Sequence, residues 1–182
     1  AERAAVLFRA AAWMRERRAS LAALEVMEAG KPWDQCDADV CEAIDFCEYY
    51  GREALRLGAG VPILQAPGET NTYRYQPRGM GVVIAPWNFP LAIPCGMVTA
   101  ALVTGNTVVF KPASATPLSG VNLIHAFDDA GLPPGIVNLV MGPGDTVGDE
   151  LQKNQDIDGI VFTGSYDVGF KLFKSFSTSW PR

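Results

Sequence analysis

Apolar side chains recur at intervals of three to four residues along positions 1–29, which is the spacing of an amphipathic helix. The predicted inner face carries Leu7, Ala10, Ala11, Met14, Leu21, Leu24 and Met27. Gly30 followed by Pro32 is a helix stop signal. A second helix is predicted over 33–57, with acidic residues on its outer face and an inner face that carries Val40, Ile44, Cys47 and Leu55.

Glycine and proline become frequent between 58 and 79, and the helical spacing of apolar residues is lost there. Only 72–76 alternates enough between polar and apolar residues to predict a strand. We therefore expect a linker or a hairpin in this stretch.

From Met80 onward, short apolar runs alternate with helical segments. Strands are predicted at 82–85, 107–111, 136–141 and 160–163, and helices at 91–103, 118–130, 145–153 and 168–176. Strands made of near-continuous Val, Ile and Phe are typical of a parallel sheet with helices on both faces. The fold class is therefore α/β, a Rossmann-like doubly wound parallel sheet preceded by two long helices. The expected division is a helical segment at 1–57, the linker or hairpin at 58–79, and βα units at 80–182.

Charge and composition exclude several functions. The chain has 15 Lys+Arg against 20 Asp+Glu, and its basic residues cluster only at 15–18, so nucleic acid is not an expected partner. The longest apolar stretches, 97–103 and 136–141, are well short of the ~20 residues that span a bilayer. Four scattered cysteines and no secretory leader favour a reducing compartment, the cytoplasm or the mitochondrial matrix.

Ligands of an open parallel sheet bind at the carboxyl ends of its strands, so the segments after each predicted strand are the candidate site. These segments are 86–90, 111–114, 142–148 and 162–169. Glycines in the last two permit a close backbone approach, and the helix that follows each presents unpaired N–H groups, which suits a diphosphate. The alternative is that these glycines only close βα turns, because 142–148 reads G-x-G-x-x-x-G, one residue longer than the dinucleotide fingerprint.

Two polar residues at the other strand ends have equally open interpretations. Lys111 can place a point charge over ribose hydroxyls or a phosphate, or it can be a solvated lysine that ends a strand. Asn88, between Pro86 and Pro90, can donate to a ligand or can be a turn or helix N-cap residue. Their joint occurrence at strand ends favours a binding site.

The chain resembles the aldehyde dehydrogenase superfamily over essentially its whole length through Phe176. The motifs that carry the resemblance occur in the family's order and approximate spacing at 86–90 (Pro-Trp-Asn-Phe-Pro), 105–112, 131–135 and 162–165 (Phe-Thr-Gly-Ser). Within the family, 37–50 and 73–79 look like the branch that oxidises glutamate semialdehyde, the open form of 1-pyrroline-5-carboxylate, including the bifunctional proline-utilisation enzymes. The resemblance thus implies an NAD-dependent dehydrogenase of proline catabolism, with a small-molecule aldehyde as substrate and a homo-oligomeric parent enzyme. Another aldehyde as the substrate stays an alternative.

The same resemblance implies roles for individual residues. Asn88 would be catalytic, its side-chain amide donating to the oxygen that becomes negative when a thiolate attacks the aldehyde. Ile84, Pro86 and Trp87 would frame the nicotinamide. Lys111 would hold the adenosine ribose. The adenine and diphosphate path would be lined by Gly142, Gly144, Thr163, Gly164, Ser165 and Gly169.

Ser114 is a departure that affects the choice of cofactor. Many NAD-selective relatives have a glutamate at this position, and without that carboxylate a 2′-phosphate is less strongly repelled. NAD is the expected cofactor and NADP stays an alternative. The sequence predicts no metal site, because the cysteine spacings do not fit zinc.

The resemblance also places the family's general-base glutamate and its nucleophilic cysteine beyond Arg182, and Ala1 begins inside a helical pattern. The expectation is therefore an excised portion, inactive by itself. Cys36, Cys41 and Cys47 on the second predicted helix and Cys95 after the Asn88 segment are expected to be structural, since no histidine adjoins them. His125 is expected on a helix face. The rival hypothesis is a folded, non-catalytic module with an exposed edge strand that self-associates, and saturable NAD binding separates the two.

Overall fold

The computed structural model describes residues 1–60 and 62–178. The elements follow in the order α1 (Glu2–Glu16), α2 (Arg18–Ala29), α3 (Trp33–Gly58), β1 (Met80–Ile84), α4 (Ala92–Val103), β2 (Thr107–Lys111), α5 (Pro117–Asp129), β3 (Val137–Leu139), the π-helical turn η1 (Gly144–Gly148), α6 (Asp149–Lys153), β4 (Gly159–Phe162) and α7 (Tyr166–Thr178).

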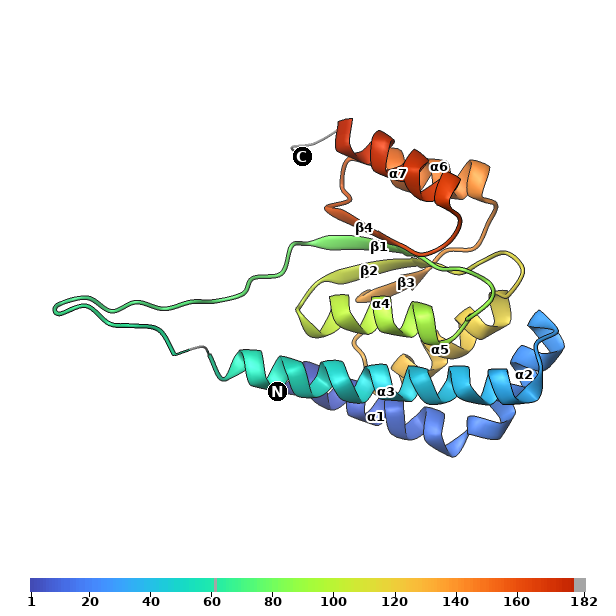
Figure 1. Ribbon diagram of the computed structural model, residues 1–182, viewed down its shortest axis with the longest axis horizontal. Helices are drawn as coiled ribbons and strands as arrows, with labels where there is room; N and C mark the ends of the chain where they lie inside the picture. Colours follow the sequence, from blue (N-terminus) through green and yellow to red (C-terminus); the bar gives the residue numbers. More distant parts are fainter. Residues whose placement is uncertain (61, 179–182) are drawn as a thin grey trace.

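The four strands form one parallel sheet in the order β3-β2-β1-β4. Figure 1 shows α4, α5 and the N-terminal helices on one side of this sheet, and α6 and α7 on the other. The doubly wound α/β prediction is therefore confirmed. Helix α3 packs against both α1 and α4, so the N-terminal helices share one core with the βα units. No helix among residues 1–60 and 62–178 is long and apolar enough to cross a membrane.

Several local predictions were wrong in ways that the geometry explains. The single helix expected at 1–29 is two helices, because the Arg17 backbone leaves the helical region at φ −108°, ψ 12°. Gly30 ends α2 in the left-handed conformation, as its position predicted. Met27 and Leu55 are exposed although they were placed on inner faces. The helix expected at 145–153 is divided into η1 and the short α6.

No strand forms at 72–76, where one was predicted. The chain from 62 to 79 is instead an extended arm that projects from the body and doubles back on itself (Figure 1). Its two limbs are joined by a side-chain clamp: Gln65 Nε2 donates to the carbonyl oxygen of Asn71 at 2.9 Å, and the Asn71 N–H donates to Gln65 Oε1 at 2.6 Å. This clamp substitutes for a backbone ladder.

Candidate functional site

The carboxyl ends of the strands bring the predicted residues to one edge of the sheet. Ile84, the last residue of the central strand β1, lies in register between Lys111 of β2 and Phe162 of β4. The Thr163 N–H donates to the carbonyl oxygen of Ile84 at 3.2 Å, and the Ala85 N–H donates to that of Lys111 at 3.2 Å. Residues that follow three different strands are thereby fixed side by side.

Lys111 differs from the solvated lysine of the alternative interpretation. Its side chain is buried, with the residue 5% exposed, and burial lowers the pKa of its ammonium group. The ammonium donates to the carbonyl oxygen of the adjacent Pro112 at 3.4 Å, a long contact. An ammonium has three protons, so this lysine retains capacity to donate to ligand oxygens.

Ser114 and Gly142 connect the second and third strand ends, since the Ser114 hydroxyl donates to the Gly142 carbonyl oxygen at 3.3 Å. A side chain at Gly142 has no room, because a Cβ there would lie 2.3 Å from Val147 Cγ2. Gly144 has open space around it and is not sterically required. The N–H groups of Val147 and Gly148 both donate to the Pro143 carbonyl oxygen, so this turn offers fewer free donors than predicted.

The fourth strand end forms a hollow of about 560 Å³, which is lined by Phe162, Thr163, Gly164, Ser165, Tyr166, Gly169, Phe170 and Phe173. Ser165 directly precedes α7, and its hydroxyl oxygen accepts from the Val168 N–H at 3.4 Å. The Phe162 ring lies against the turn, since a Cβ on Gly164 would approach it to 2.6 Å. The first N–H groups of α7 have no partner within the helix, but Asp167 in this turn already supplies a negative charge.

Asn88 lies on the exposed loop between β1 and α4, beside Trp87, which is also exposed, and the half-buried Pro86. The N-cap of α4 is Leu91, so the N-cap interpretation of Asn88 is wrong. The acceptor that caps this helix comes from α3. Asp39 accepts from the N–H groups of Leu91 at 3.3 Å and Ala92 at 3.1 Å. Asn88 is thus an exposed residue on a loop whose far end is fixed.

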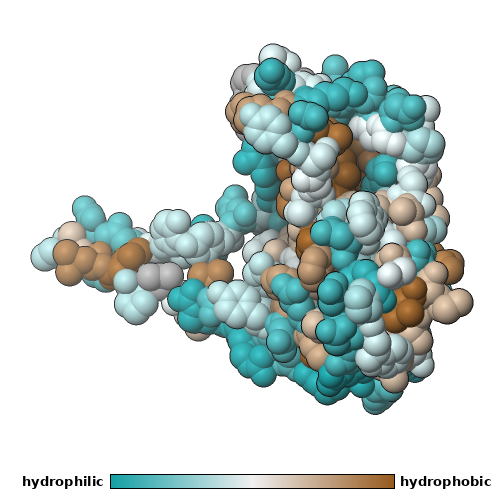
Figure 2. Space-filling view, turned by 45° about the vertical axis from the view of Figure 1, so that its right-hand side comes forward, coloured by the Kyte–Doolittle hydropathy of each residue, from teal (hydrophilic) through white to brown (hydrophobic). Residues whose placement is uncertain are grey.

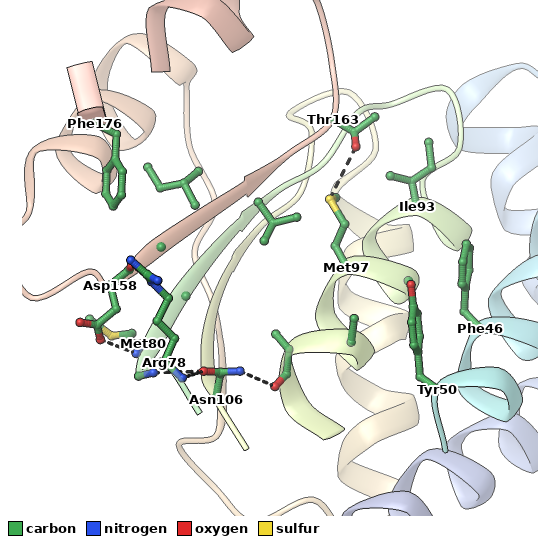
Figure 3. A pocket seen from close by; sticks show the side chains of 18 residues that line it. Phe46, Tyr50, Arg78, Met80, Ile93, Met97, Asn106, Asp158, Thr163 and Phe176 are labelled. Atoms are coloured by element: carbon green, nitrogen blue, oxygen red, sulfur yellow. Dashed lines mark hydrogen bonds between the residues drawn. The ribbon is translucent and has the colours of Figure 1, made fainter. Parts of the chain in front are cut away.

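A second, larger pocket of about 740 Å³ extends along β1 and β4 between α4 and α7 (Figure 3). At the carboxyl end of the strands, the Thr163 hydroxyl donates to Met97 Sδ at 3.6 Å. The stacked rings of Phe46 and Tyr50 form its wall on α3. Figure 2 shows hydrophobic side chains inside a hollow in the upper part of the molecule, near the level of the sheet and α7.

Apart from Thr163, the residues that line this pocket were not among the predicted site residues, although the sequence contains a signal for those on α4. Ile93, Gly96, Met97 and Ala100 recur at helical spacing on α4 and all line the pocket. Gly96 is closely approached by Phe46, because a Cβ at this position would lie 3.1 Å from the ring. The sequence pattern alone does not distinguish such a stripe from one that is covered by other helices.

The cysteines are placed as core residues. Cys36, Cys47 and Cys95 are buried and Cys41 is half-buried, and all four are free thiols. The neighbouring Cys47 thiol and burial raise the pKa of Cys95, and burial raises that of Cys36, which makes both weaker sources of thiolate. His125 is exposed on α5, as predicted. Within the described residues, no group of three His, Cys, Asp or Glu could hold a metal ion.

Comparisons with known proteins agree with this geometry. The aldehyde dehydrogenase family profile matches residues 1–182. A 1-pyrroline-5-carboxylate dehydrogenase of Anoxybacillus flavithermus is 53% identical over 172 residues, which cover 94% of this chain and 33% of that protein. A solved 1-pyrroline-5-carboxylate dehydrogenase from Thermus with bound NAD is 47% identical with a TM-score of 0.91, covering 95% of this chain and 34% of that one. A solved bifunctional proline utilization A (PutA) protein is 39% identical with a TM-score of 0.95, covering 100% of this chain and 19% of that one. The chain therefore spans about a third of the length of the curated relatives it matches.

Proposed function

Since the chain belongs to the aldehyde dehydrogenase family, we propose that it supplies the cofactor-binding portion of an enzyme that oxidises L-glutamate 5-semialdehyde to glutamate in proline catabolism. The substrate is taken from the relatives named 1-pyrroline-5-carboxylate dehydrogenase and proline utilization A, because that pyrroline is the cyclic form of the semialdehyde. The cofactor is NAD, which one solved relative contains. NAD bound here would supply the acceptor for the hydride that the substrate carbon loses.

In this proposal Lys111 donates to the hydroxyl groups of the adenosine ribose, beside Ser114. The buried ammonium with donors to spare fits this task, because hydrogen bonds from a charged group in a desolvated place are strong. Ser114 presents a hydroxyl that does not repel a 2′-phosphate, so NADP is the second cofactor to measure.

The remaining cofactor residues divide between two ends of the site. Ile84, Pro86 and Trp87 frame the nicotinamide. Adenine and the diphosphate follow a path lined by Gly142, Gly144, Thr163, Gly164, Ser165 and Gly169. Because Asp167 lowers the attraction of the α7 N-terminus for an anion, these residues would hold the diphosphate mainly through backbone N–H groups.

Asn88 is the proposed catalytic residue of this chain. Its exposed amide donates to the aldehyde oxygen as that oxygen takes up negative charge during nucleophilic attack. None of the four cysteines is the nucleophile in this proposal, because three are buried and none has a histidine beside it in the sequence.

The observation that carries the proposal is the register that fixes Lys111, Ile84 and Thr163 at one sheet edge. We would titrate the chain with NAD, NADP and adenosine diphosphate by calorimetry, after thermal unfolding has shown that it is folded. Saturable binding of NAD, with competition by adenosine diphosphate, is the expected result. A cooperatively folded chain with no saturable NAD binding would overturn the proposal and favour the non-catalytic module.

A further inference from the structure

Two carboxyl groups and one ammonium group are buried together behind the Asn88 loop. Lys31, in the turn between α2 and α3, places its Nζ 3.7 Å from Glu25 Oε2 and 3.8 Å from Asp39 Oδ2. The side chains of all three are at most 8% exposed. The carboxyl oxygens of Glu25 and the Lys31 ammonium have no hydrogen-bond partner at normal distance within the described residues. We call Glu25, Lys31 and Asp39 the buried cluster.

The buried cluster contacts both ends of the loop segment that follows Asn88. The Lys31 ammonium lies 4.3 Å from the centroid of the Phe89 ring, a cation–π distance. Asp39 accepts from the N–H groups of Leu91 and Ala92, which start α4. Asn88 is therefore adjacent in the sequence to Phe89, whose ring contacts Lys31. It also lies three residues before Leu91, whose N–H group donates to Asp39.

Stability alone does not account for such a cluster. Burying charges costs about as much as their attraction returns, and apolar side chains of similar size often stabilise a core equally well. Apolar side chains cannot accept hydrogen bonds from the N–H groups of Leu91 and Ala92, and they cannot hold Phe89 by an electrostatic contact. A buried charged group of this kind is best explained by the geometry it enforces.

We propose that the buried cluster positions Asn88, with Lys31 and Asp39 fixing the loop from beneath so that the Asn88 amide keeps one orientation at the sheet edge. Glu25 completes the cluster by holding Lys31 between two carboxyl groups. These are positioning residues, since they act through Phe89, Leu91 and Ala92. The proposed purpose of this orientation rests on the proposed function of Asn88.

The protonation state of Glu25 offers a second way to perturb the buried cluster without a mutation. Burial first, and then the neighbouring Asp39 carboxyl group, raise the pKa of Glu25 to about 9, against the opposing effect of Lys31. Glu25 therefore holds a proton at neutral pH. The groups that act on it are Lys31 from the turn, and Asp39 and Cys36 from α3. Loss of the Glu25 proton places a second negative charge beside Asp39, and the repulsion disturbs the contacts that Asp39 makes with α4.

The first test uses nuclear magnetic resonance on the whole chain, comparing Asp39→Asn with Asp37→Asn. Asp37 is the matched control, since it lies on the same helix but pairs with Arg18 at the surface. We expect Asp39→Asn to shift and broaden the Asn88 side-chain amide and Trp87 indole signals. It should also raise hydrogen exchange at Leu91 and Ala92 roughly tenfold relative to Val83, the factor that 1.4 kcal/mol represents. Equal loss of protection at all these sites, or unchanged Asn88 and Trp87 signals, would overturn the proposal.

The second test does not require the Asp39→Asn variant to fold. In the unaltered chain, raising the pH from 7 to 10 should move the Asn88 and Trp87 signals with a midpoint near 9, and Glu25→Gln should abolish the movement. A Cys36→Ala background removes the other neighbouring acid. A flat response in the unaltered chain contradicts the proposal. These signals are recorded without cofactor, so failure of NAD binding would overturn the proposed function and leave the positioning result intact.

Discussion

The Sγ atoms of Cys47 on α3 and Cys95 on α4 lie 3.6 Å apart inside the core. The Cys95 thiol also donates to the carbonyl oxygen of Ala43 at 3.4 Å. These contacts join the helix that carries Asp39 to the helix that follows the Asn88 loop. Both thiols therefore belong to the framework that supports the site.

This placement predicts slow thiol chemistry. In the folded chain, Cys41 should react with a disulfide reagent at pH 8 at least about tenfold faster than Cys47 or Cys95, because the latter are buried and the pKa of Cys95 is raised. Mass spectrometry of the labelled peptides after a time course measures each rate. Labelling of Cys95 as fast as Cys41 in the folded chain would show an accessible thiolate and contradict the structural role of Cys95.

Glu25 predicts a pH dependence of stability. Its pKa is raised from 4.5 to about 9 on folding, so the folded chain binds the extra proton between these values. The contribution of Glu25 to the free energy of unfolding is fully present below pH 4.5 and is lost as the pH rises toward 9. Urea unfolding should show that the unaltered chain loses stability relative to Glu25→Gln over this window. Parallel pH profiles for the two proteins would refute a raised pKa.

Asn88→Ala separates catalysis from structure. Because Asp39 rather than Asn88 caps α4, the free energy of unfolding should change by less than about 0.5 kcal/mol, and NAD affinity should be unchanged. In a complete aldehyde dehydrogenase that carries this segment, single-turnover hydride transfer should fall by about 10²–10³. Unfolding, titration and stopped-flow absorbance on the same variant provide the three values.

Asn106→Ala is the matched control for this change. Asn106 Oδ1 accepts from the N–H groups of Arg78 and Gly79, and its amide donates to the Ala101 carbonyl oxygen at 3.1 Å. Its loss should cost stability, roughly 1–3 kcal/mol, with normal hydride transfer in the folded fraction. An Asn88→Ala variant that behaved like Asn106→Ala would remove the oxyanion role.

The sequence was sufficient to predict the sheet because its two inner strands, β1 and β2, are apolar runs with buried residues. Strand β2 begins at Thr107 and ends at Lys111 as expected, since a buried parallel strand is a continuous apolar run. The strand predicted at 72–76 does not form, for a different physical reason. Alternation of polar and apolar residues predicts a strand only where a partner strand exists, and Tyr73 and Tyr75 are both exposed on the arm.

The charged interior was predictable only in part. Asp39 is buried on the stripe of Cys36, Val40, Ala43 and Cys47, a position that is consistent with helical spacing. The acidic residues of this helix were nevertheless expected on its outer face, because carboxylates are seldom fully buried unless they are paired. The partners that make burial possible are Lys31, in the turn before this helix, and the N–H groups of Leu91 and Ala92, which are distant in the sequence.

The central claim is that this sheet edge binds NAD through Lys111, and one variant tests it most directly. Lys111→Met retains the buried stem and removes only the ammonium, and Lys153→Met, an exposed lysine on α6, is the matched control. Calorimetry should show that Lys111→Met weakens NAD binding by roughly 1.5–3 kcal/mol, about 10- to 150-fold in Kd, while Lys153→Met leaves it unchanged. Equal NAD affinity in the unaltered chain and in a folded Lys111→Met variant would contradict the claim.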